Sequence, residues 1–99
     1  MRISEEQAHT IKSIVQNVFG ESTKLKLFGS RTLDHAKGGD IDLFIQTDQI
    51  VEQPARLLSQ IEAKIIMQLG ERKVDIILDA PNIEKTPVSE IAERTGVAL

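Results

Sequence analysis

Hydrophobic residues recur at helical spacing in two long segments of the chain. In the first, the run Ser-Glu-Glu-Gln from Ser4 places an N-cap hydroxyl three residues before Gln7, and the apolar stripe stops at Gly20. In the second, Pro54 suits the first position of a helix, and the stripe stops at Gly70. The stripes comprise Ile11, Ile14, Val15, Val18 and Phe19 in the first segment and Leu57, Leu58, Ile61, Ile65, Ile66 and Leu69 in the second. Both segments are therefore predicted to form amphipathic helices.

Three shorter segments have the patterns of β-strands. Lysines alternate with leucines at the start of residues 24–28, and this segment runs into Gly29. Residues 41–45 are mostly apolar and follow a glycine pair that frees the backbone for a tight turn. Residues 73–78 contain a run of β-branched side chains, which favour strands. The hydrophobic residues of segment 29–39 follow neither helical nor strand periodicity, so an irregular segment is expected between the first two strands.

A short helix is predicted near the end of the chain. Thr86 can cap this helix, Pro87 suits its first position, and Gly96 lies at its end. The order of elements is then helix, strand, irregular segment, strand, helix, strand and short helix. This order indicates an α+β fold with a small mixed β-sheet covered by helices on at least one face. The first two strands can pair directly, and the helix after the second permits parallel pairing with the third.

Length and composition narrow the functional classes. The 99 residues, of which 40% are hydrophobic, predict a single domain over residues 1–99. Twelve Lys and Arg against fifteen Asp and Glu give a net charge of −3, which does not attract nucleic acid. The absence of cysteine excludes thiolate metal sites and thiol nucleophiles. No apolar stretch approaches a membrane span and the first residues are not a signal peptide, so we expect a cytoplasmic protein without membrane contact.

The most informative chemistry lies in the run Gly38-Gly39-Asp40-Ile41-Asp42. Alternation along a strand sends Asp40 and Asp42 to the same face, with their Cα atoms roughly 6.5–7 Å apart. Two neighbouring carboxylates repel each other unless a cation or protons neutralise them, and Mg²⁺ prefers carboxylate, water and phosphate oxygens. The pair is therefore a candidate seat for metal-nucleotide chemistry. The alternative is an exposed strand end where both acids are merely solvated.

Two further features bear on this pair. Gly29 and Ser30 directly follow the first strand, where a glycine lets backbone approach a ligand and the hydroxyl can hold phosphate oxygens. The same two residues also suit an ordinary turn, and the Walker pattern is absent. Asp75 lies inside an otherwise apolar strand, where a carboxylate is costly unless it is paired, protonated or coordinating. Simple exposure on one face of the sheet is the alternative for Asp75.

Together these residues resemble the nucleotidyltransferase superfamily with the DNA-polymerase-beta-like fold, and more closely its minimal nucleotidyltransferases (MNT). The resemblance covers nearly the whole chain and rests on three runs: Leu27-Phe28-Gly29-Ser30-Arg31, Lys37-Gly38-Gly39-Asp40-Ile41-Asp42-Leu43 and Gly70-Glu71-Arg72-Lys73-Val74-Asp75. It implies that the carboxylates of Asp40, Asp42 and Asp75 are catalytic and hold two Mg²⁺ ions that bridge the triphosphate of ATP. In-line transfer needs charge neutralisation and positioning more than covalent help, which suits three carboxylates with two ions.

The same resemblance implies nucleotide contacts, a partner and a function. Gly29 and Ser30 would anchor the β and γ phosphates, and Arg31 is a candidate for a further phosphate contact. Proteins of this kind are commonly encoded beside a HEPN-family protein, and the pair resembles a toxin–antitoxin system in which the MNT member transfers AMP to a toxin tyrosine. We therefore expect a protein adenylyltransferase that acts as an antitoxin, forms a hetero-oligomer with its HEPN partner or a homodimer alone, and binds no DNA.

Other functions are also compatible with the chain. A non-catalytic antitoxin could keep the same fold and neutralise its partner by covering the partner's active site, although it would have no reason to cluster three acids. A small-molecule nucleotidyltransferase of the antibiotic-modifying type would need an additional helical region for its acceptor. Residues 88–97 resemble the first helix and turn of a helix-turn-helix, but the recognition helix does not follow in this sequence.

Overall fold

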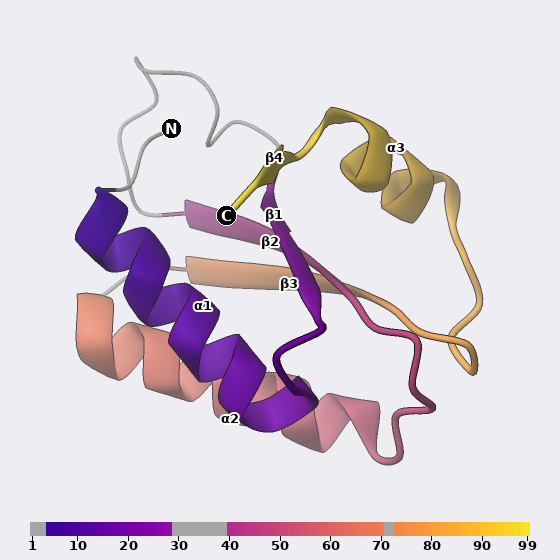
Figure 1. Ribbon diagram of the computed structural model, residues 1–99, viewed down its shortest axis with the longest axis horizontal. Coiled ribbons are helices and arrows are strands. Elements are labelled where there is room, and N and C mark those ends of the chain that lie inside the picture. The colour runs from indigo at the N-terminus through magenta and orange to yellow at the C-terminus, as the bar shows by residue number, and fades with distance from the viewer. Residues whose placement is uncertain (1–3, 29–39, 71–72) are drawn as a thin grey trace.

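The computed structural model describes residues 4–28, 40–70 and 73–99, with only the backbone of Asp40. The described residues form three helices and one four-stranded sheet (Figure 1). In chain order the elements are α1 (Glu5–Phe19), β1 (Lys24–Leu27), β2 (Asp40–Gln46), α2 (Pro54–Leu69), β3 (Lys73–Asp79), α3 (Pro87–Thr95) and β4 (Val97–Ala98). This arrangement confirms the predicted α+β fold with a small mixed sheet. None of the described helices is long and apolar enough to span a membrane.

The helix boundaries follow from local hydrogen bonding. At the start of α1, the Ser4 hydroxyl accepts a hydrogen bond from the backbone N–H of Gln7 at 3.1 Å, and the Gln7 side chain accepts one from the Ser4 N–H at 3.1 Å. Thr86 and Ser89 form the same capping box at the start of α3. Gly20 directly follows α1 and has a φ of 103°, a backbone conformation that glycine adopts more readily than other residues. These contacts confirm the predicted starts of α1 and α3, and α2 begins at Pro54 as predicted.

The sheet has the strand order β3-β2-β1-β4. β1 is antiparallel to β2, with Leu25 opposite Ile45, and β2 is parallel to β3, with Ile41 opposite Val74. The helix α2 connects the two parallel strands, as the sequence predicts for such a crossover. Both predicted pairings are therefore present.

The strand β4 is absent from the sequence-based expectations. After α3 the chain returns along β1 in an antiparallel pairing that places Val97 opposite Leu27. The N–H of Leu99 donates a hydrogen bond to the carbonyl oxygen of Leu25 at 3.0 Å, which extends this pairing. The residues that directly follow α3 therefore pair with the sheet and do not form the turn of a helix-turn-helix.

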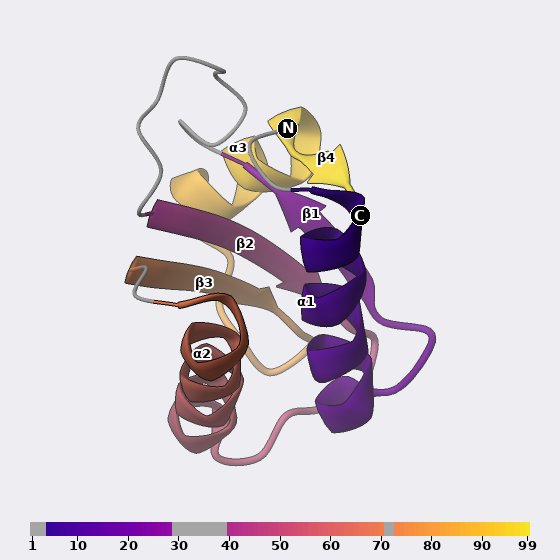
Figure 2. The same cartoon turned by 90° about the vertical axis from the view of Figure 1, so that its left-hand side faces the viewer.

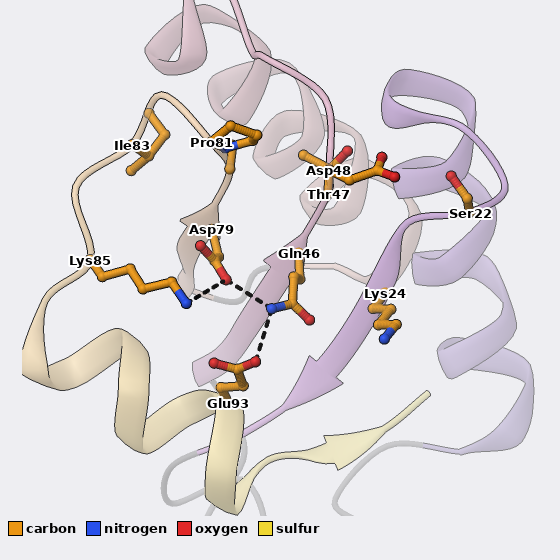
Figure 3. Close-up of a pocket in the computed structure, with 11 residues that line it drawn as sticks. Ser22, Lys24, Gln46, Thr47, Asp48, Asp79, Pro81, Ile83, Lys85 and Glu93 are labelled. Carbon is orange, nitrogen blue, oxygen red and sulfur yellow. Dashed lines mark hydrogen bonds and ion pairs between the residues drawn. The ribbon is translucent and has the colours of Figure 1, made fainter.

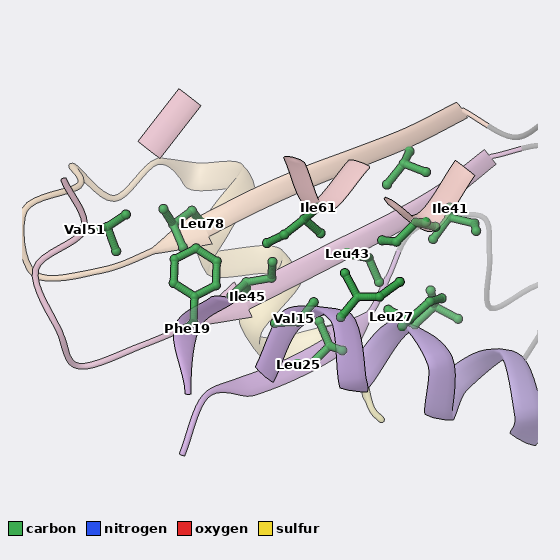
Figure 4. Close-up of a cluster of buried hydrophobic side chains, with 14 of the residues drawn as sticks. Val15, Phe19, Leu25, Leu27, Ile41, Leu43, Ile45, Val51, Ile61 and Leu78 are labelled. Carbon is green, nitrogen blue, oxygen red and sulfur yellow. The ribbon is translucent and has the colours of Figure 1, made fainter. Parts of the chain in front are cut away.

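The two faces of the sheet are covered unequally. Helices α1 and α2 lie side by side on one face, and α3 crosses the other (Figure 2). The core lies between the sheet and the helix pair (Figure 4). Its most deeply buried members are Ile11, Val15, Leu27, Ile41, Leu43, Ile45, Ile61 and Ile65. Phe44 and Ala92 are also buried but outside that cluster, on the side of the sheet where α3 packs.

Candidate metal and nucleotide site

Two aspartates stand at matching positions where the parallel strands β2 and β3 begin. The register places Asp42 of β2 opposite Asp75 of β3. Ile41 and Leu43 are fully buried beneath the helix pair, so alternation puts Asp42 on the other face, which carries α3. Paired residues of neighbouring strands share a face, and their Cα atoms are about 4.8 Å apart. The structure therefore brings these two predicted site residues together.

The two acids differ in their surroundings. Asp42 is half-buried, and its carbonyl oxygen accepts a hydrogen bond from the N–H of Phe28 at 3.0 Å. Asp75 has a side chain that is 54% exposed, and its Oδ2 atom lies 4.0 Å from Nζ of Lys73. Exposure and this lysine explain how β3 tolerates Asp75 within its apolar segment. The carboxylate of Asp75 is therefore accessible from solvent.

The remaining predicted site residues are placed only in part. Asp40 is the first residue of β2 and stands opposite Lys73 in the register, while its side chain lies outside the described residues. Gly29, Ser30 and Arg31 also lie outside the described residues. Among the side chains that are described, no three His, Cys, Asp or Glu groups are close enough together to hold a metal ion.

The chemistry of the donor set fits magnesium. Asp42 and Asp75 offer carboxylate oxygens, the hard ligands that Mg²⁺ takes in proteins together with water and substrate phosphate. When the protein supplies two carboxylates, water and phosphate oxygens fill the remaining coordination positions of Mg²⁺. This is the usual arrangement for metal-nucleotide complexes. Asp40, two residues before Asp42 on the same strand, is the third candidate ligand.

A cavity of about 610 Å³ lies at the opposite end of the same face, where β2 and β3 end (Figure 3). It is lined by Ser22, Lys24, Gln46, Thr47, Asp48, Asp79, Ala80, Pro81, Ile83, Lys85 and Glu93. Four of these residues come from the loop between β3 and α3, and one comes from α3 itself. The cavity is therefore closed on one side by the segment that carries α3.

Gln46 is the central polar group of this cavity. Its Nε2 atom donates to Oδ2 of Asp79 at 2.8 Å and to Oε2 of Glu93 at 2.9 Å. Nζ of Lys85 lies 3.9 Å from the same oxygen of Asp79, a side chain that is only 10% exposed. Lys26 adds a hydrogen bond from Nζ to the carbonyl oxygen of Glu93. Together these contacts tie α3 to the sheet.

Sequence reasoning missed this polar cluster. Gln46, Asp79 and Glu93 lie on three different elements and belong to no short motif. The one available signal was Asp79, an acid directly after the apolar run of β3 and therefore at the edge of the core. Its partners become visible only when the sheet order is known.

Comparison with known proteins gives no match to a protein-family model and no match to a curated protein.

Proposed function

We propose that this protein is an Mg²⁺-dependent nucleotidyltransferase of the minimal type, with a polymerase-beta-like fold. In this proposal it transfers AMP from ATP to a tyrosine hydroxyl of a HEPN-family toxin encoded nearby and so acts as the antitoxin. The observation that carries the proposal is the pairing of Asp42 with Asp75, with Asp40 two residues before Asp42 on the same strand. Carboxylates at directly opposite positions on one face of a sheet are close enough to share a divalent cation, and carboxylate oxygens are ligands that Mg²⁺ prefers.

The chain's acids have distinct tasks in this reaction. Asp40 and Asp42 would hold Mg²⁺ against the triphosphate, and Asp75 would complete the metal site and help to activate the attacking hydroxyl. Bound Mg²⁺ supplies charge neutralisation on the phosphates. The tyrosine oxygen forms a bond to the α-phosphorus, the bond from that phosphorus to the bridging oxygen breaks, and pyrophosphate leaves. The hydroxyl proton passes to a carboxylate or to solvent, and the product is a tyrosyl-AMP phosphodiester.

A macromolecular acceptor suits the exposure of the site. The side chain of Asp75 is 54% exposed. Small-molecule acceptors are usually held in concave sites that bury most of their surface. An acceptor side chain on the surface of another protein, in contrast, can reach an exposed carboxylate without being enclosed in a pocket. This difference favours a protein acceptor over a small molecule of the antibiotic type.

The experiment that tests the proposal follows label from α-phosphate-labelled ATP. The full chain is incubated with Mg²⁺ and the product of the neighbouring gene, as wild type, Asp42→Asn and Asp75→Asn. Asp48→Asn is the matched control, because Asp48 is an exposed acid after the far end of β2. We expect protein-bound label on the partner that requires Mg²⁺, persists in the control and is lost in both other variants.

Two results would contradict the proposal. If no component is labelled and Asp42→Asn still neutralises the partner, the protein is a non-catalytic antitoxin that acts by complex formation. Label that persists in both Asp42→Asn and Asp75→Asn would place the reaction at another site.

A further inference from the structure

The segment that contains α3 and β4, residues 86–99, is attached to the sheet differently from the first helix. Four large apolar side chains of α1 are buried, whereas α3 buries only Ser89 and Ala92. The large apolar side chains of α3, Val88 and Ile91, are 56% and 50% exposed. Because the burial of apolar surface is the main contribution to packing, α3 is held to the sheet less strongly than α1.

Polar contacts supply much of the remaining attachment. The Glu93 carboxylate accepts a hydrogen bond from Nε2 of Gln46 at 2.9 Å, and the Glu93 carbonyl oxygen accepts one from Nζ of Lys26. Beyond α3, β4 adds two residue pairs with β1, and the N–H of Leu99 donates to the carbonyl oxygen of Leu25. Hydrogen bonds of this kind replace bonds to water, so each stabilises the docked segment only modestly.

The chain is fixed to the core just before this segment. The Asn82 side chain donates a hydrogen bond to the carbonyl oxygen of Val51 at 2.8 Å and accepts one from the Val51 N–H at 3.0 Å. Ile83 packs partly against the core. The next two residues, Glu84 and Lys85, are exposed and belong to no helix or strand. The chain can therefore bend at these two residues without disturbing the core.

The segment covers apolar residues beside the candidate site. Phe44 is 1% exposed and lies on the face of the sheet where α3 packs, and the half-buried Ile77 stands opposite Phe44 in the register. Asp42 and Asp75 occupy the neighbouring positions on the same face, two residues earlier in each strand. Removal of α3 from this face would expose apolar surface directly beside the paired acids.

We propose that residues 86–99 form a lid that opens as one unit about residues 84–85 while the rest of the fold stays intact. Gly96 joins α3 to β4, and a Cβ atom at this position would lie only 2.8 Å from Cβ of Lys26, so release of one element loosens the other. The open state presents Phe44 and Ile77 beside the acids and so enlarges the surface that a partner protein can contact. This inference does not depend on the reaction proposed above.

Native-state amide hydrogen exchange of the full chain tests the lid. The reporters are the amides of Ala92 in α3 and Leu99 after β4, and the amide of Ile65 in α2 reports on the core. Local opening and global unfolding are distinguished by their response to variants on the two sides of the sheet.

Three variants are compared with the wild type. Ile61→Val trims a fully buried side chain of α2 on the face of the sheet opposite the lid. Gln46→Met removes a contact of the lid itself. Gln60→Met is the matched control for this second change, because Gln60 is exposed on α2.

We expect the amides of Ala92 and Leu99 to have similar protection factors that are at least about tenfold lower than that of Ile65. Ile61→Val should lower the protection of Ile65 about fivefold and leave both lid amides unchanged. Gln46→Met should lower the protection of both lid amides about 30-fold, and Gln60→Met should change neither.

The lid is refuted if Ile61→Val lowers the protection of the lid amides as much as that of Ile65, because these amides then exchange only through global unfolding. It is also refuted if Gln46→Met changes the protection of Ala92 but not that of Leu99, because α3 and β4 then move separately. Both outcomes leave the nucleotidyltransferase proposal unaffected, since no reaction is measured.

Discussion

Asp42 of β2 lies directly opposite Asp75 of β3, close to the ends at which both strands begin. The core fixes this relationship, because the alternate residues of both strands, such as Ile41 and Val74, are buried beneath the helices. A slip of one residue in either strand would turn its acid into the core and its apolar side chains outward. The packing of the opposite face therefore determines the geometry of the candidate site.

The first prediction separates the function of Asp75 from its contribution to stability. In metal-free protein, Asp75→Asn should change the free energy of unfolding by less than about 1 kcal/mol, because the side chain is 54% exposed and its ion pair with Lys73 is weak. With Mg²⁺ and the ATP analogue, the melting temperature of the wild type and of Asp48→Asn should rise. Thermal unfolding checks this, and an equal rise in Asp75→Asn would contradict the assignment of Asp75 as a ligand.

The second prediction concerns the amide that joins α3 to the sheet. Gln46→Met should lower the free energy of unfolding by about 2 kcal/mol, because Asp79 and Glu93 each lose a donor and Asp79 is only 10% exposed. Urea denaturation measures this loss. Gln60→Met is the control, since Gln60 is exposed on α2 and should change stability by less than about 0.5 kcal/mol. Equal stability of both variants would show that the cluster does not hold α3.

The third prediction tests the close approach of α3 to β1. A Cβ atom added at Gly96 would lie 2.7 Å from the carbonyl oxygen of Ala92 and 2.8 Å from Cβ of Lys26. Gly96→Ala should therefore destabilise the protein by about 1–3 kcal/mol and loosen the pairing of β4 with β1. Urea denaturation and amide exchange at Leu99 report the two effects. A wild-type midpoint with a protected Leu99 amide would be inconsistent with this packing.

The fourth prediction uses a buried hydroxyl. Thr23 is 7% exposed, and its Oγ1 atom has no hydrogen-bond partner among the described residues. Thr23→Val keeps the shape and removes this group, so we expect the free energy of unfolding to rise by about 1 kcal/mol. Thr47→Val should do the opposite, because the Thr47 hydroxyl accepts a hydrogen bond from the N–H of Gln49 at 3.3 Å. Chemical denaturation distinguishes the two signs, and destabilisation by Thr23→Val would indicate an unseen partner.

The helices and three of the strands could be predicted because their signals are local. The capping box of Ser4 and Gln7, the position of Pro54 and the alternation of residues 24–27 each lie within a few neighbouring residues. The strand β4 could not be predicted in this way. It consists of two exposed residues that show no hydrophobic period. It forms because the backbone of these residues pairs with the edge of β1.

The candidate site likewise has features that are local in the sequence and features that depend on tertiary structure. The spacing of Asp40 and Asp42 follows from strand alternation, whereas the position of Asp75 opposite Asp42 depends on the parallel register that the core imposes. The cluster around Gln46 depends on sheet order and on the return of α3 over the sheet, two properties that no short motif contains. Local patterns thus indicate which acids are candidates, and tertiary packing decides which of them lie opposite each other.

The most direct test of the account is a crystal structure of the protein with Mn²⁺ and the α,β-methylene analogue of ATP, examined by anomalous scattering. Mn²⁺ takes the same oxygen ligands as Mg²⁺ and can be located without ambiguity. The account predicts an anomalous peak bound by carboxylate oxygens of both Asp42 and Asp75, in contact with the phosphates. A nucleotide bound in the cavity around Gln46, or Mn²⁺ bound without Asp42 and Asp75, would contradict it.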